Sequence, residues 1–234
     1  MTDEAVENRL TSRSIRSFVI RNGRLTTAQA AALDTLLPRY GIEYQEGEQL
    51  DLKAVFGRTA PIWLEIGFGN GDALVDMASR YPETDFIGIE VHEPGVGQAL
   101  MGIEAAQLGN VRIIRHDAME VLQQMISAAA LNRVLLFFPD PWRKKRHFKR
   151  RIVQNEFVEL VADKLDTGGV LHCATDWQDY AEWMLEKLQN SNKLINQSTT
   201  GEYSDRPAWR TNTRFEKRGE RLGHAVFDLL YTRR

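Results

Sequence analysis

The stretch IWLEIGFGNGD, residues 62–72, decides the fold of this chain. It begins as a short apolar run and continues into three alternating glycines, with Asp72 where a helix is expected to begin. Glycine lets the backbone turn sharply and approach a ligand without a Cβ in the way. A strand, a glycine-rich turn and a helix in this order are typical of the first unit of a parallel α/β sheet. Such sheets bind ligands at the carboxyl ends of their strands.

The chain downstream of this stretch repeats the alternation of strand and helix. Further short apolar runs occupy residues 86–90, 111–114, 134–138 and 169–174. Helical spacing of apolar residues appears between them, over 121–129 and 177–188. Residues 193–197 and 225–231 indicate two more strands, joined by the long polar stretch 198–224. Apolar strands linked by helices predict a doubly wound, mostly parallel, Rossmann-like α/β sheet with both faces covered.

The first 60 residues differ from the rest, so we divide the chain into an N-terminal extension, 1–60, and an α/β domain, 61–234. The extension begins with scattered arginines. Thr26 and Thr27 offer an N-cap for a short helix over about residues 28–37, which Pro38 is expected to end.

Composition indicates an ordinary folded protein with one unusual feature. The chain has 234 residues, 43% of them apolar, and no apolar run long enough to span a membrane. The N-terminus carries no apolar signal segment, and a single cysteine, Cys173, excludes an internal disulfide, so we expect a cytoplasmic location. The net charge is −2, but residues 143–151 hold seven basic and no acidic residues. The rest of the chain therefore has 23 basic against 32 acidic residues, and the basic segment 143–151 predicts a partner rich in phosphate.

Acidic residues follow the first strands in a pattern that indicates a nucleoside ligand. Glu90 ends the second strand, where a carboxylate can accept hydrogen bonds from ribose hydroxyls. Asp117 follows the third strand, where it either accepts from an adenine amino group or caps a helix. The glycine spacing is G-x-G-x-G, and Asp72 would repel a pyrophosphate, which favours a ligand without one. This pattern resembles the class I S-adenosylmethionine-dependent methyltransferases. The residues that carry it are Glu65, Gly67, Gly69, Gly71, Glu90 and Asp117.

The fourth strand runs into the turn Pro139-Asp140-Pro141-Trp142 and from there into the basic segment. The two prolines stiffen the turn and present Asp140 at the sheet edge. Trp142 either stacks on a base or packs against the sheet edge. His147 and Phe148 are possible stacking groups within the basic segment.

The segment PDPWRKKRHFKRR, residues 139–151, resembles the signature of the bacterial tRNA (guanine-N7-)-methyltransferase family, the TrmB family. Further matches to its pattern are IRSFVIRNGRLTTAQAAALDTLLPRYG (15–41), EIGFGNGD (65–72), ATDW (174–177) and TNTRFEKRG (211–219). The resemblance therefore runs from about residue 15 to the end of the chain.

This resemblance implies methyl transfer from S-adenosyl-L-methionine to N7 of guanine 46 in the variable loop of tRNA, without a metal. Carried over residue by residue, it assigns cofactor contacts to Glu65, Gly67, Gly69, Glu90, Asp117 and Asp140, with Asp140 also catalytic. It assigns substrate contacts to Lys144, Asp176, Thr213, Arg214, Phe215 and Glu216. It assigns RNA contacts to Arg146, His147, Phe148, Lys149, Arg150 and Arg151. The N-terminal arginines either reach the tRNA or form a flexible arm.

The chemistry of guanine agrees with these roles. N7 already carries a free lone pair, so the site must supply positioning and electrostatic support rather than a strong base. Asp140 or Asp176 can accept hydrogen bonds from the N1–H and N2–H₂ edge of guanine, which adenine lacks.

Three alternative functions remain. A methyltransferase acting on an exocyclic amine would be expected to have a second proline after the acid of the strand-four turn, where this chain has Asp140-Pro141-Trp142. A small-molecule methyltransferase leaves the basic segment without a purpose. An RNA-binding module without catalysis would not need the acidic and glycine residues of a cofactor pocket. The histidines show no metal-ligand spacing, and the sequence does not distinguish a monomer from a homodimer.

Overall fold

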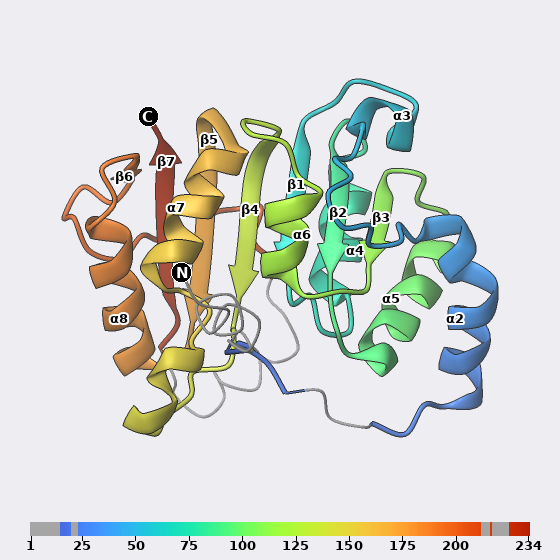
Figure 1. Ribbon diagram of the computed structural model, residues 1–234, viewed down its shortest axis with the longest axis horizontal. Coiled ribbons are helices and arrows are strands. Elements are labelled where there is room, and N and C mark those ends of the chain that lie inside the picture. Colours follow the sequence, from blue (N-terminus) through green and yellow to red (C-terminus); the bar gives the residue numbers. More distant parts are fainter. Residues whose placement is uncertain (1–14, 20–22, 212–215, 217–224) are drawn as a thin grey trace, which may run out of the picture.

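The structure is a computed structural model that describes residues 15–19, 23–211, 216 and 225–234. Its centre is a seven-stranded sheet in the order β3-β2-β1-β4-β5-β7-β6. The strands are β1 (Ile62–Ile66), β2 (Asp85–Ile89), β3 (Val111–Ile114), β4 (Leu131–Phe137), β5 (Leu165–Thr175), β6 (Leu194–Asn196) and β7 (Phe227–Arg233). All pairs from β3 to β5 are parallel, whereas β7 runs antiparallel to β5 and β6. The predicted doubly wound, mostly parallel sheet is confirmed (Figure 1).

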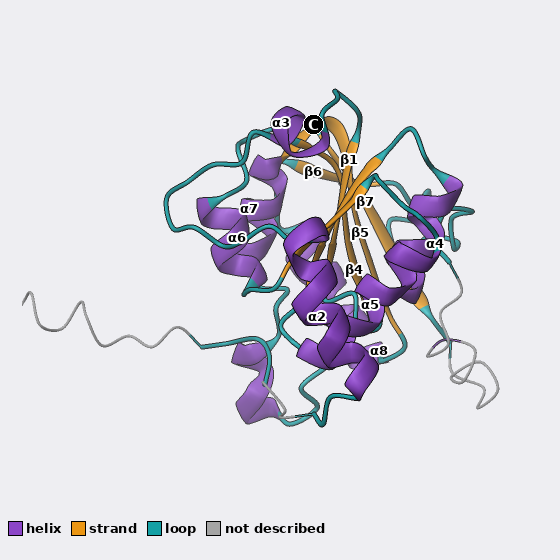
Figure 2. Ribbon diagram, turned by 90° about the vertical axis from the view of Figure 1, so that its right-hand side faces the viewer, coloured by secondary structure: helices purple, strands orange, loops and turns teal. Residues whose placement is uncertain are grey.

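Helices cover both faces of this sheet and bury an apolar core on each (Figure 2). One face is packed by α6 (Ala118–Gln124), α7 (Asn155–Lys164) and α8 (Gln178–Gln189). The other is packed by α2 (Thr27–Tyr40), α4 (Asp72–Arg80) and α5 (Glu93–Ala105). The strands are buried on both sides, which explains why they read as continuous apolar runs in the sequence. A short helix, α3 (Leu52–Phe56), and a 3₁₀ helix, η1 (Lys145–Arg150), complete the described elements.

The first helix corrects one expectation. It begins as predicted, because Thr26 and Gln29 form a reciprocal capping box at its start. It does not end at Pro38 but continues to Tyr40, with Pro38 inside its last turn. A proline there removes only one amide donor, and the N–H of Gly41 still donates to the carbonyl of Leu37 at 2.7 Å.

The N-terminal extension from Gly23 onward packs against the β3 side of the sheet. Helix α2 lies across α5 at a place where a Cβ on Gly97 would come within 2.9 Å of the carbonyl oxygen of Gln29. The chain after α2 joins the sheet edge, where the N–H of Ile42 donates to the carbonyl of Ile113 at 2.8 Å. The extension from Gly23 onward is therefore part of the same packed body.

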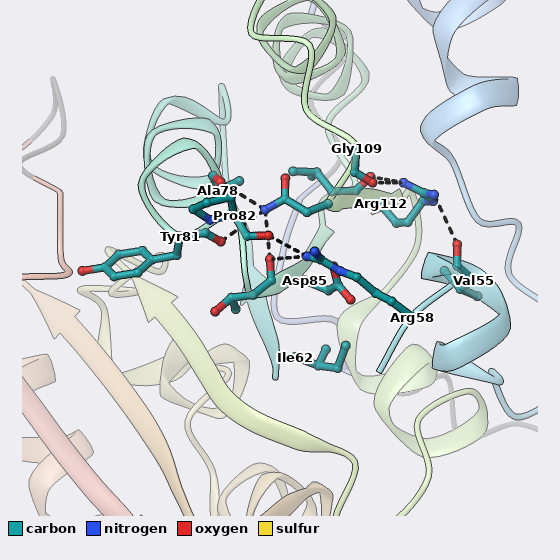
Figure 3. Close-up of polar contacts among 12 residues, drawn as sticks. Val55, Arg58, Ile62, Ala78, Tyr81, Pro82, Asp85, Gly109 and Arg112 are labelled. Atoms are coloured by element: carbon teal, nitrogen blue, oxygen red, sulfur yellow. Dashed lines mark hydrogen bonds and ion pairs between the residues drawn. The ribbon is translucent and has the colours of Figure 1, made fainter. Parts of the chain in front are cut away.

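A polar cluster lies at the end of the sheet where β2 begins (Figure 3). The buried carboxylate of Asp85 accepts from Nε and Nη2 of Arg58, at 2.9 and 2.6 Å. Nδ2 of Asn110 donates to the carbonyls of Ala78, Tyr81 and Thr84. These contacts join the loops around the start of β2 to one another, so they stabilise the fold. None of the helices described in this structure is long and apolar enough to cross a membrane.

Candidate active site

The glycine-rich turn after β1 has a backbone that only glycine adopts readily. Gly67, Gly69 and Gly71 all have positive φ, at 69°, 58° and 78°. A Cβ on Gly71 would lie 2.5 Å from the Cβ of Ala99, so α5 also approaches the turn closely. The spacing seen in the sequence is thus required both by the turn and by helix packing.

Glu90 fixes this turn from the end of β2. Its Oε2 accepts from the backbone N–H of Gly69 at 3.0 Å, and its Oε1 accepts from the N–H groups of Val91 and His92 at 2.6 and 2.9 Å. Each carboxylate oxygen has more than one lone pair. Glu90 is therefore held in a defined orientation and can still accept from a ligand.

Glu65 lies beneath the turn as a buried acid. Its side chain is 3% exposed, and its Oε2 has no hydrogen-bond partner in the described residues. Burial, followed by the charge of Glu90, raises the pKa of Glu65 to about 8. A buried carboxyl with one unpartnered oxygen fits a site that receives a cation.

A cavity of about 250 Å³ opens at the carboxyl ends of β1, β2 and β4. Its lining includes Phe18, Gly67, Glu90, Ala118, Phe137 and Asp140. The cavity lies where the strand order reverses, between β1 and β4, which is the usual ligand position in such sheets. An adjoining pocket shares Phe18, Val91 and His116 with it and extends to Asp117.

Asp117 is a helix cap that also faces this adjoining pocket. Its carboxylate accepts from the N–H of Met119 at 2.9 Å at the start of α6. Burial is the largest influence on its pKa, which is raised above the usual value. Of the two interpretations of Asp117 from the sequence, helix capping is therefore observed, and its position leaves a ligand contact open as well.

The turn after β4 presents Asp140 to the cavity through a strained backbone. Two residues that flank it, Phe138 and Trp142, have positive φ at 50° and 46°, which is unusual for bulky side chains. The N–H of Phe138 donates to the carbonyl of Ala174 at 2.8 Å and holds the turn against β5. Asp140 itself is exposed and lines the cavity.

Trp142 packs against the N-terminal segment. Its indole Nε1 donates to the carbonyl of Ser17 at 3.0 Å, and the Arg150 guanidinium lies 4.0 Å from its ring centroid. Arg150 also donates to the carbonyls of Arg16 and Phe18, at 3.2 and 2.9 Å. Trp142 therefore packs within the protein in this structure, but against Ser17 and Arg150 rather than against the sheet edge. Residues 15–19 cross beneath the tip of β4 in Figure 1 and close one side of the cavity.

The basic segment contains an outer set of exposed residues and other residues that turn toward the protein. The outer set is exposed to solvent and consists of Arg143, Lys144, Lys145, Arg146 and Lys149. Arg150 is half-buried in the contacts above, and His147 meets the edge of Trp142 with ring centroids 5.8 Å apart.

Two expectations for the basic segment need correction. Arg151 is only 1% exposed and turns into the protein, so it does not offer its charge to a phosphate. Phe148 is half-buried, with the Arg151 guanidinium over its ring and Trp183 in a T-shaped contact, so one face of the ring is already occupied. In both cases a partner from elsewhere in the chain decides where the side chain points. A run of basic residues gives no signal for that partner.

Asp176 lines a separate pocket just beyond β5, next to the Asp140 turn. This pocket also contains Arg143, Trp177, Asp179, Glu182 and Phe227. The Arg143 guanidinium lies 4.2 Å from the ring centroid of Trp177. Because β4 and β5 are neighbours, Asp140 and Asp176 emerge at the same edge of the sheet.

Glu216 corrects another expectation, because it is buried. Its two oxygens accept from Nη1 and Nη2 of Arg210 at 2.6 and 2.7 Å, and Arg210 also bonds Asp228. The carboxylate is committed to this internal network and is not a surface acceptor for guanine. Three other substrate contacts expected from the sequence, Thr213, Arg214 and Phe215, lie outside the described residues.

Comparison with known proteins assigns the family. A family model described as putative methyltransferase matches residues 59–229. A tRNA (guanine-N(7)-)-methyltransferase of Idiomarina loihiensis is 57% identical over 219 residues, covering 94% of this chain and 89% of that protein. The chain belongs to the tRNA (guanine-N7-)-methyltransferase family.

Further similarities agree with this family and with the fold. A tRNA (guanine-N(7)-)-methyltransferase of Photorhabdus laumondii is 54% identical over 233 residues, covering 100% of this chain and 97% of that one. The crystal structure of the aminoglycoside resistance methyltransferase NpmB1 superposes with a TM-score of 0.53 at 17% identity, over 79% of this chain and 92% of that one. This last similarity concerns the fold alone.

Two other titratable groups, His172 and Cys173, are buried within the sheet. Within the described ranges, no three His, Cys, Asp or Glu side chains gather as a metal site. His172 pairs with Asp228 at 2.7 Å inside the sheet, and burial lowers its pKa. Cys173 is fully buried, as predicted, and burial raises its pKa to about 12.

Sequence reasoning did not foresee that Ser17 and Phe18 line the cavity. The residues of the stretch 15–41 predicted a capped helix, and only the resemblance to the family connected the stretch with the site. Its backbone carbonyls make the decisive contacts, and a sequence gives no signal for which carbonyls will accept from Trp142 and Arg150.

Proposed function

We propose that this protein transfers a methyl group from S-adenosylmethionine to N7 of guanine 46 in the variable loop of tRNA. The observation that carries the proposal is that the turn lining the cavity, at Asp140, continues directly into the exposed basic residues. A cofactor pocket and a surface for RNA phosphates thus meet at one edge of the sheet. Relatives that are 54–57% identical over 94–100% of this chain, and that bear the name tRNA (guanine-N(7)-)-methyltransferase, support the same activity.

The residues around the cavity fit the cofactor. Glu90 and Asp117 are placed along it as acceptors for ribose and adenine, and the glycines let the backbone come close. Glu65 offers a buried, unpartnered oxygen beneath the turn, which suits a positively charged ligand. When bound, S-adenosylmethionine supplies an electrophilic methyl group, and S-adenosylhomocysteine remains after transfer. The proposed cofactor contacts are Glu65, Gly67, Gly69, Glu90, Asp117 and Asp140.

Asp140 is the proposed catalytic residue. Guanine N7 has an in-plane lone pair, so no proton has to leave before the new N–C bond forms. The guanine ring gains one positive charge as the methyl arrives, and a carboxylate nearby stabilises that charge. Asp140 orients the base at the cavity mouth, and Asp176, on the neighbouring strand end, accepts from the N1–H and N2–H₂ edge. Adenine lacks that pair of donors and is rejected.

The tRNA backbone contacts are assigned to the outer set of the basic segment, Arg143, Lys144, Lys145, Arg146 and Lys149, with His147 beside them. Thr213, Arg214 and Phe215 remain proposed substrate contacts. In this proposal residues 61–234 carry catalysis in the cytoplasm, and the extension 1–60 contributes Ser17 and Phe18 to the cavity lining.

The proposal is tested with purified protein, a tRNA transcript and cofactor labelled in the methyl group. We expect one methyl group per transcript, and no label when guanine 46 is replaced by adenine. Equal labelling of both transcripts would contradict the assigned position.

An RNA-binding module without catalysis is the second candidate, favoured only by the exposed basic residues. Titration calorimetry with S-adenosylmethionine separates the two functions, since a module of that kind would give no binding heat.

A further inference from the structure

Arg151 is the most deeply buried charge of the basic segment, and it pairs with Asp179, whose side chain is 55% exposed. Its Nε donates to the carbonyl of Pro141 at 2.9 Å, and its Nη2 pairs with Asp179 at the start of α8. Its guanidinium lies 3.6 Å from the ring centroid of Phe148 and 4.8 Å from that of Tyr180. One side chain thus joins the Asp140 turn, η1 and α8.

The carbonyl that Arg151 holds belongs to the turn that presents Asp140. Pro141 follows Asp140 directly, and the flanking Phe138 and Trp142 have strained positive φ values. A strained backbone persists only where its surroundings over-determine it. Proline offers no N–H, so the carbonyl of Pro141 is the backbone group by which this residue can be fixed.

The neighbouring arginine holds the other side of the same turn. Arg150 covers Trp142 and donates to the carbonyls of Arg16 and Phe18. Two consecutive basic residues therefore brace the turn, whereas the outer set faces solvent. A phosphate contact requires a guanidinium that can reach solvent, and the side chain of Arg151 has no exposed area.

We propose that Arg151 is a positioning residue, which fixes the Pro139–Pro141 turn and through it Asp140, and that it is not a phosphate-binding residue. The inference rests on the proposed function only in so far as Asp140 acts in methyl transfer. Arg151 provides a forked donor that spans a carbonyl and a carboxylate at once, which a lysine cannot reproduce.

Two substitutions of Arg151 separate positioning from phosphate binding. Arg151→Lys keeps the charge but loses the fork, and we expect kcat to fall about 10- to 100-fold. Arg151→Gln removes the charge, and we expect the slope of log Kd for tRNA against log salt to stay as in wild type. A phosphate contact at this position would give the reverse pattern, with near-normal kcat in Arg151→Lys and a slope about 0.7–0.9 shallower in Arg151→Gln.

Each of the two measurements, kcat and the salt slope of tRNA binding, has a matched control. Arg39→Lys makes the same chemical change on the exposed side of α2, away from the site, and should keep kcat within about twofold. Lys149→Gln removes an exposed charge of the outer set and should make the salt slope shallower.

A measurement without tRNA keeps the test independent of activity. Hydrogen exchange of a peptide covering residues 137–144 should speed up in both Arg151 variants and not in Arg39→Lys. If the Arg151 variants do not fold, Asp179→Asn replaces them, since it weakens the same bridge at an exposed residue. Unchanged exchange in every variant that folds would overturn the proposal. Absence of methyl transfer by the wild type would overturn the proposed function alone and would leave the exchange test intact.

Discussion

Single side chains around the cavity behave according to their burial rather than their type. Glu65 and Asp140 are both carboxylic acids at one edge of the sheet, yet one is enclosed and the other faces solvent. The same contrast separates Arg151 from Lys149, two residues apart in the basic segment. Charge alone therefore does not assign a role at this site, and each residue has to be tested by itself.

Asp140→Ala should lower kcat about 100-fold or more at saturating cofactor, because the charge that develops on guanine loses its nearest carboxylate. Asp140→Asn keeps the shape of the side chain and provides the matched control for loss of charge. Methyl incorporation into a tRNA transcript measures both variants. Turnover close to wild type in Asp140→Ala would remove this residue from the mechanism.

Glu65 should make stability depend on pH. Because its pKa is raised to about 8 in the folded state, the folded protein binds more protons than the unfolded chain between pH 4.5 and 8. This contribution to stability is therefore fully present below about pH 4.5 and is lost as the pH rises toward 8. Glu65→Gln removes it, and the difference in unfolding free energy between wild type and variant should shift by up to about 4–5 kcal/mol over that range. Urea unfolding at the two ends of the range measures the shift, and an equal difference at both ends would contradict it.

At the level of elements, the strands were the most predictable part of the chain. The runs 62–66 and 111–114 match β1 and β3 residue for residue, because strands buried on both faces are mostly apolar, with Glu65 and Arg112 as the exceptions in these two. Strand β5 starts four residues earlier than its apolar run, at Leu165, since pairing with β4 begins there before the glycines. Helix α2 continues past Pro38 because a proline in the last turn removes only one amide donor.

The parts of the site that a sequence displays directly are the glycine spacing and the proline-stiffened turn at Asp140, and the three glycines do adopt positive φ. The ligand contacts of Glu90 and Asp140 stay predictions, although Glu90 does reach the glycine turn, where it accepts from the N–H of Gly69. Glu216 and Arg151 were expected to contact substrate or RNA, but each is buried and pairs with another residue of the chain, Glu216 with Arg210 and Arg151 with Asp179 of α8. Such pairings are made in three dimensions, and no local pattern encodes them.

The outer set of the basic segment should give tRNA binding its salt dependence. If about four phosphates are engaged, the slope of log affinity against log salt should be about −3 to −4. The double variant Lys145→Gln/Lys149→Gln should make that slope shallower by about 1.4–1.8, and Lys53→Gln in α3 serves as a matched control. Filter binding over a salt series measures each slope. A wild-type slope near zero would exclude this segment from tRNA binding.

Across the whole molecule, the cavity and the exposed basic residues lie at the same edge of the sheet. The end at which β2 begins uses Arg58 and Asp85 for internal bonds, whereas the carboxyl ends of the strands gather the cavity, the Asp140 turn and the exposed basic residues. The N-terminal segment 15–19 is drawn to the same edge by Trp142 and Arg150. Ligand binding at the point where strand order reverses is a property of the fold, and the basic segment makes that position suitable for RNA.

The most direct test of the proposed activity is to incubate the purified protein with an unmodified tRNA transcript and S-adenosylmethionine, and then to cleave the RNA chemically at N7-methylguanine. We predict a single cleavage at guanine 46 of the variable loop, absent without cofactor and absent when that guanine is replaced. Methyl incorporation without cleavage at any guanine would contradict the N7 assignment.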